Sequence, residues 1–186
     1  FGGLVGGFVG GWLILRGTFL ANNEEKSGMV GVFGLRGPFG AWLCVWGALA
    51  MLTSAPFDDW WHNAYGLDVK ILSPPHTVLA LGMWAIVLGA LFLVLREQNL
   101  AAFEQGDTVE ATARTLPGQW MFIVAGGIIV AMAATFLTEE SWPNQQRNQT
   151  FFIMSCIVYP TYLVALSRAS RFRFGATMIA AVYMLI

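Results

Sequence analysis

Long apolar stretches recur along the chain, and short polar connections separate them. A helix that crosses a membrane needs about 20 mostly apolar residues, because each residue adds about 1.5 Å against a hydrocarbon core of roughly 30 Å. Backbone groups in lipid must be hydrogen-bonded within the segment, and the stretches are too long and too continuously apolar for barrel strands. Six stretches, the last of them short, predict six transmembrane helices: 1–20, 39–56, 76–95, 119–138, 151–167 and 174–186. We therefore expect an all-α, polytopic integral membrane bundle that forms one domain over residues 1–186.

The composition agrees with a protein that faces lipid over most of its surface. Hydrophobic residues make up 56% of the chain and charged residues only 11%, whereas a soluble domain has about 25% charged residues. The formal net charge of -1 provides no basic field for phosphates, so no nucleic-acid partner is expected. The chain begins inside one apolar stretch, without an initiator methionine, and ends inside another. We expect it to be part of a longer protein.

Lysine and arginine alternate strictly between the two sides of the predicted bundle. The connections at 21–38, 96–117 and 168–173 hold seven of them, and the connections at 57–75 and 139–150 hold two. Basic residues favour the cytoplasmic side of a membrane, so the first three connections are predicted to lie inside and the other two outside. We expect a bacterial inner membrane, with the second set facing the periplasm.

The first apolar stretch contains two rows of glycine at a spacing of four residues. Such rows let helix backbones approach closely in lipid. Packing within the chain is the favoured interpretation, and a subunit interface is the other. The two rows are Gly2, Gly6 and Gly10, and Gly3, Gly7 and Gly11.

Residues 58–76, between the second and third stretches, concentrate polar chemistry on the predicted outer side and hold both histidines of the chain. A short helix that begins near Asp58 would place Asp58 and His62, four residues apart, on one face. Gly66 permits a turn after it. Pro75 is the expected first residue of the next helix, because proline suits that position, and His76 then lies in the first turn.

Asp58, His62 and His76 are therefore predicted to converge at the outer membrane surface as one carboxylate and two imidazoles. Three protein ligands that leave one position open are typical of a catalytic metal site, and this set suits copper, zinc or iron. In the structural alternative, Asp58 or Asp59 caps a helix and the histidines bond to loop carbonyls. In a third, a histidine is an axial ligand of haem or chlorophyll; covalent haem is excluded because no CxxCH motif is present.

The same stretch resembles metal-binding motifs in the C subunit of particulate methane and ammonia monooxygenases. The resemblance rests on Asp58-x3-His62, thirteen residues and then His76, with Trp61 before the first histidine and Ser73-Pro74-Pro75 before the second. It covers about twenty residues and the six-helix layout. It implies that Asp58, His62 and His76 bind copper, or zinc, in an outward connection between membrane helices.

The family carries a second, similar constellation further along its chain, and this sequence departs from it there. The corresponding connection begins Glu139-Glu140-Ser141-Trp142-Pro143 and contains no histidine. A second site of that type is not expected. Glu139 and Glu140 are interpreted as solvated acids at a helix end.

Two functions follow as hypotheses. The leading one is a metal-site subunit of a multi-subunit membrane enzyme, with copper-dependent oxidation of a small apolar substrate. Whether the chain catalyses this reaction or only binds the metal stays open. The alternative is a non-catalytic scaffold, or a haem- or pigment-binding subunit, of a respiratory or photosynthetic complex.

Overall fold

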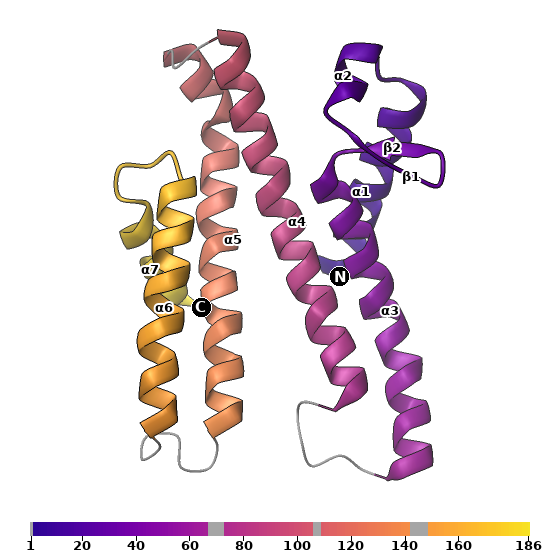
Figure 1. The fold of residues 1–186 in the computed structure, drawn as a ribbon, viewed down its shortest axis with the longest axis vertical. Coiled ribbons are helices and arrows are strands. Elements are labelled where there is room, and N and C mark those ends of the chain that lie inside the picture. Colours follow the sequence, from indigo (N-terminus) through magenta and orange to yellow (C-terminus); the bar gives the residue numbers. More distant parts are fainter. Residues whose placement is uncertain (1, 67–72, 106–108, 142–148) are drawn as a thin grey trace. The chain divides into compact units, whose positions relative to one another are not determined.

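The computed structural model describes residues 2–66, 73–105, 109–141 and 149–186, and it is predominantly helical (Figure 1). The predicted all-α class is confirmed. Contacts between backbone positions divide the chain into two compact units, residues 1–93 and 94–186, and each unit is described by itself. In chain order the elements are α1 (Gly2–Phe19), α2 (Asn23–Ser27), β1 (Val30–Val32), β2 (Leu35–Gly37), α3 (Phe39–Tyr65), α4 (Pro74–Gln105), α5 (Val109–Ser141), α6 (Gln149–Ala169) and α7 (Gly175–Leu185).

Each of the six apolar stretches coincides with a helix. In the part of the chain that the structure describes, α3, α4, α5 and α6 are long and apolar enough to cross a membrane. The last helix, α7, has 11 residues and is too short to be counted with them. The structure therefore supports membrane insertion through four helices, and the expected count of six spans stays a prediction.

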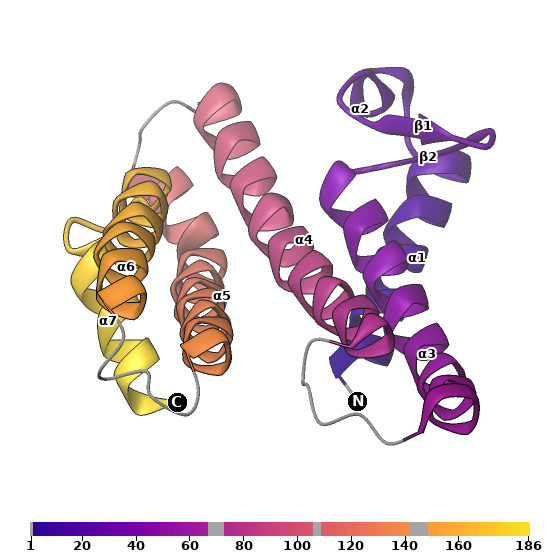
Figure 2. The ribbon, with the colours of Figure 1, turned by 60° about the horizontal axis from the view of Figure 1, so that its bottom comes forward.

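The connection 21–38 folds into a short helix and a hairpin, which the hydrophobic pattern did not predict. Strands β1 and β2 pair antiparallel, and Phe33 and Gly34 between them both have positive φ, as a two-residue turn of this hand requires. The indole Nε1 of Trp42 on α3 donates to the Val30 carbonyl at 3.1 Å. The backbone N–H of Arg36 donates to the hydroxyl oxygen of Thr18 on α1 at 2.7 Å. These bonds hold the hairpin against the ends of α1 and α3 (Figure 2).

Helix α1 packs on α3 and α4 through its glycines. A methyl group added at Gly10 would lie 2.7 Å from the Ala41 carbonyl oxygen, and one added at Gly7 would lie 2.7 Å from the Ala48 methyl. The predicted packing within the chain is thus confirmed for four of the six glycines in the two rows. Two others have no neighbour within 4 Å in the described residues. The contacting glycines are Gly3, Gly6, Gly7 and Gly10, and the others are Gly2 and Gly11.

Glycines also bring α3 and the first part of α4 into close antiparallel contact. A methyl group at Gly47 would lie 2.6 Å from the carbonyl oxygen of Gly82, and one at Gly89 would lie 2.6 Å from that of Gly40. Backbones that approach this closely leave no room for a side chain between them. The pairing places the C-terminal end of α3 beside the N-terminal end of α4, and the candidate site lies there.

The second unit is built from α5, α6 and α7 with the latter part of α4. Its core includes Phe122, Ile123 and Ile129 of α5 and Ile179 of α7, which are almost fully buried. The guanidinium of Arg171 donates to the Gln98 carbonyl at 3.1 Å and ties the connection before α7 to α4. Only 6% of the apolar segment of α6 is buried within the chain.

Candidate metal centre

Helix α3 runs without interruption through the region where a separate short helix was expected. It continues past Pro56 to Tyr65, so Asp58 lies inside a long helix. A proline in a helix interior removes one backbone hydrogen bond and costs about 3 kcal/mol. Ring contacts in the last turns help to offset this cost, the closest being Trp61 and Tyr65 with centroids 4.5 Å apart. Asp58 and His62 are therefore held one turn apart on a rigid element.

Gly66 ends α3 and orients His62. Its φ of 85° and ψ of −176° belong to a region that only glycine adopts readily. In this conformation its N–H donates to the His62 carbonyl at 3.0 Å. Its own carbonyl oxygen lies 3.1 Å from Nδ1 of His62. Because a carbonyl can only accept, Nδ1 carries a proton and donates it, so the other ring nitrogen, Nε2, is directed away from the backbone.

The start of α4 places His76. The helix begins at Pro74, one residue before the predicted Pro75. His76 lies in the first turn, as expected. The backbone oxygen of Ser73 accepts from the N–H of Thr77 at 2.9 Å. The Ser73 hydroxyl lies 3.0 Å from Nδ1 of His76.

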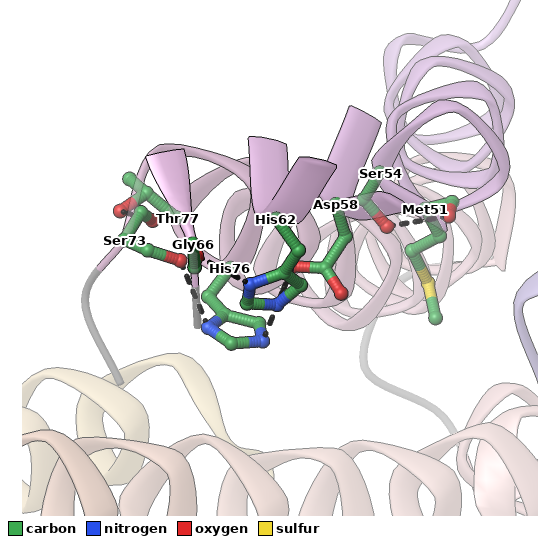
Figure 3. Close-up of polar contacts among 8 residues, drawn as sticks. All are labelled: Met51, Ser54, Asp58, His62, Gly66, Ser73, His76 and Thr77. Carbon is green, nitrogen blue, oxygen red and sulfur yellow. Dashed lines mark hydrogen bonds and ion pairs between the residues drawn. The ribbon is translucent and has the colours of Figure 1, made fainter. Parts of the chain in front are cut away.

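The structure brings together the three residues that the sequence singled out. Nε2 of His62 lies 3.4 Å from Oδ1 of Asp58, and Nε2 of His76 lies 3.7 Å from the same oxygen. Figure 3 shows the two imidazoles beside the Asp58 carboxylate, with Ser73 on the far side of the His76 ring. The three side chains are 28–38% exposed. Oδ1 of Asp58 is buried and has no hydrogen-bond partner among the described residues.

These spacings fit ligands that share one ion. Two donors each about 2.1 Å from a tetrahedral metal lie about 3.4 Å apart. In the described part of the chain, however, no group of three or more His, Cys, Asp or Glu side chains is arranged so that it could hold a metal ion. The three side chains are thus neighbours, but their torsion angles must change before all three can bind one ion. Their partial exposure leaves room for that adjustment.

The last turns of α3 also carry a group of aromatic side chains and a second acidic residue. Rings of Phe57, Trp60, Trp61 and Tyr65 contact one another along the last turns of α3. Aromatic side chains of this kind settle at a membrane interface. Asp59 is exposed, and its backbone oxygen accepts from the Asn63 amide at 2.9 Å.

These contacts agree only in part with the structural alternative, in which Asp58 or Asp59 caps a helix and the histidines bond to loop carbonyls. Asp58 does not cap a helix start, because it lies within α3. His62 does bond to a loop carbonyl, as that alternative expected, but its other ring nitrogen faces Asp58. The Ser73 hydroxyl and the Gly66 carbonyl were not singled out from the sequence. Ser73 was named only as a residue that flanks His76; a serine three residues before a histidine, at the start of a helix, is the signal that could have predicted the contact of its hydroxyl with the ring.

The connection after α5 adds no ligand that the structure can test. Glu139 and Glu140 fall in the last turn of α5, and their side chains, together with residues 142–148, lie outside the described residues.

Comparison of the chain with protein-family models, curated proteins and solved structures gives no match. The resemblance to the monooxygenase C subunit therefore rests on the sequence alone: on the stretch from Asp58 to His76 with its flanking residues, and on the predicted six-helix layout.

Proposed function

We propose that the chain is a metal-site subunit of a membrane-embedded oxidising complex, with Asp58, His62 and His76 as ligands of one copper ion. The observation that carries the proposal is the approach of both Nε2 atoms to one carboxylate oxygen, at 3.4 and 3.7 Å. The ligands come from two helices that glycine contacts hold together. Metal-binding histidines usually donate their second ring N–H to a carbonyl or another oxygen, and both histidines have such a partner here.

Electrostatics also supports a cation between His62 and Asp58. With its proton on Nδ1, a neutral His62 presents the lone pair of Nε2 to a carboxylate oxygen 3.4 Å away. Two acceptors that face each other repel. A second proton on the ring or a metal cation removes the repulsion, and a cation shared with His76 would also satisfy the buried Oδ1 of Asp58.

Copper is proposed because the motif resembles that of the copper monooxygenases and because imidazole suits copper; zinc and iron accept the same ligands. A copper ion held there would supply redox chemistry for the oxidation of a small apolar substrate. The partial exposure of the three side chains would allow a further, non-protein ligand.

The proposed setting is a bacterial inner membrane with six spans, the site at the periplasmic face, and lipid and other membrane subunits as partners. Four apolar helices and the distribution of lysine and arginine support this setting. The slight burial of α6 within the chain is compatible with contact to lipid or to another subunit.

Elemental analysis of the purified, untagged protein tests the proposal. We expect about one copper ion per chain after copper loading and dialysis, and loss of that ion in Asp58→Ala, His62→Ala and His76→Ala. Asp59→Ala is the matched control, because this neighbouring carboxylate is exposed and, among the described residues, the histidines pair with Asp58, Gly66 and Ser73 instead. Equal metal content in all four variants and the wild type would contradict the proposal.

A scaffold subunit remains the second candidate, favoured by the slight burial of α6. It predicts that the protein binds no metal and that His62→Ala leaves the assembly intact. An absorption spectrum with a haem or chlorophyll band would instead favour pigment ligation by a histidine.

A further inference from the structure

We infer that Ser73 is the positioning residue for His76, and that its hydroxyl lets this imidazole present either form of Nε2 to Asp58, with a proton or with a lone pair. The inference rests on the proposed metal site and deepens it. It concerns a residue that flanks His76 in the sequence motif but is not one of the three proposed ligands, and the motif gives its hydroxyl no role.

The two histidines are held by partners of different chemistry. Nδ1 of His62 faces a carbonyl oxygen, which can only accept a hydrogen bond. Nδ1 of His76 faces the hydroxyl of Ser73 at 3.0 Å, and a hydroxyl can donate or accept by rotation about its C–O bond. His62 is therefore restricted to one neutral tautomer, and His76 is not.

Ser73 is suited to this task because its position is fixed while its hydroxyl hydrogen can turn. The residue is only 5% exposed. Its backbone oxygen accepts both the N–H and the hydroxyl of Thr77, at 2.9 and 3.0 Å. The hydroxyl oxygen is thus anchored at the first turn of α4, and the described residues give it no partner besides His76.

The consequence differs between the metal-free and metal-bound site. Without metal, the carboxylate of Asp58 favours a proton on Nε2 of His76, and the Ser73 hydroxyl then donates to Nδ1. With metal, Nε2 must offer its lone pair, so Nδ1 carries the proton and donates to the serine oxygen. The His76 ring would lose the proton on Nε2 and gain one on Nδ1 by exchange with water, which its 38% exposure allows. The charge of the ring does not change.

The test uses the small number of histidines. The chain contains two, so labelling histidine with ¹⁵N in the untagged protein reports these two imidazoles alone. In the metal-free protein we expect His62 with its proton on Nδ1 and His76 with its proton on Nε2. Zinc, a diamagnetic probe, should bring both to the Nδ1-protonated form.

Three variants separate positioning from a general structural effect. Ser73→Ala should lower zinc affinity by about 10- to 100-fold, as loss of a hydrogen bond to a metal-binding histidine usually does, and should change the His76 signals while those of His62 stay. Ser73→Thr keeps the hydroxyl and should restore most of the affinity. Thr77→Val is the matched control, because it removes a neighbouring hydroxyl that bonds to Ser73 but not to His76.

The outcomes distinguish this inference from the proposed function. If the wild type binds zinc and Ser73→Ala binds it equally well with unchanged His76 signals, Ser73 is not a positioning residue and the metal site stands. If the wild type binds neither zinc nor copper, the proposed function fails. The metal-free ¹⁵N spectra then decide on the Ser73–His76 bond by themselves, and a His76 that already carries its proton on Nδ1 would contradict the inference.

Discussion

Nε2 of His76 lies 3.7 Å from Oδ1 of Asp58, and this contact joins the end of α3 to the start of α4. Neither residue reaches the other through a local turn. Their approach depends on the antiparallel pairing of the two helices, which glycine contacts determine further along. The geometry of the candidate site is therefore coupled to packing inside the apolar part of the unit.

Replacement of Gly47 by alanine tests this coupling. The added methyl group would lie 2.6 Å from the Gly82 carbonyl oxygen, so the helices must separate, at a cost of about 1–3 kcal/mol. We expect a lower midpoint of thermal unfolding and weaker metal binding, although no ligand is changed. Gly11→Ala is the control, because nothing in the described residues lies within 4 Å of its added methyl group. Unchanged metal affinity in Gly47→Ala would mean that the contact does not set the position of His76.

Gly66→Ala is expected to destabilise the end of α3 by about 1–3 kcal/mol, because alanine is strained at a φ of 85° and a ψ of −176°. Relief of that strain would move the carbonyl that holds Nδ1 of His62. Chemical unfolding in detergent measures the loss of free energy, and zinc titration measures the effect on the site. Gly28→Ala serves for comparison, since Gly28 has a φ of −96° and open space around it. Equal stability of the two variants would argue against the proposed backbone constraint.

The predicted orientation can be tested with cysteines at two exposed positions. In a Cys44→Ala, Cys156→Ser background, Asn63→Cys on the last turn of α3 should react with a membrane-impermeant maleimide in spheroplasts. Phe33→Cys at the tip of the hairpin, 91% exposed in the structure, should react only after the membrane is opened. The reverse pattern would invert the topology and place the candidate site in the cytoplasm.

The sequence predicted the helices well because apolar stretches of about 20 residues have few other stable structures in lipid. The predicted proximity of Asp58, His62 and His76 is found in the structure. A spacing of four on a helix places Asp58 beside His62, and the pairing of α3 with α4 brings His76 to them. The metal itself stays a prediction.

Other features depended on tertiary contacts that local patterns do not reveal. The extension of α3 past Pro56 relies on ring contacts after the proline. The hairpin at 30–37 has strands of three residues, too short for a periodic signal, and its bond to Trp42 is long-range. The sequence signal for the pairing of α3 with α4 is a pair of glycines seven residues apart on each helix: Gly40 and Gly47, and Gly82 and Gly89.

Counting the imidazoles around bound copper tests the proposed metal site most directly. Pulsed electron paramagnetic resonance of the untagged, Cu²⁺-loaded protein detects the remote nitrogen of each coordinated histidine ring, and the chain has only two such rings. We expect two coordinated imidazoles in the wild type and one in either His62→Ala or His76→Ala. A wild-type spectrum without imidazole nitrogens, or one that stays the same after either replacement, would contradict a shared site at Asp58, His62 and His76.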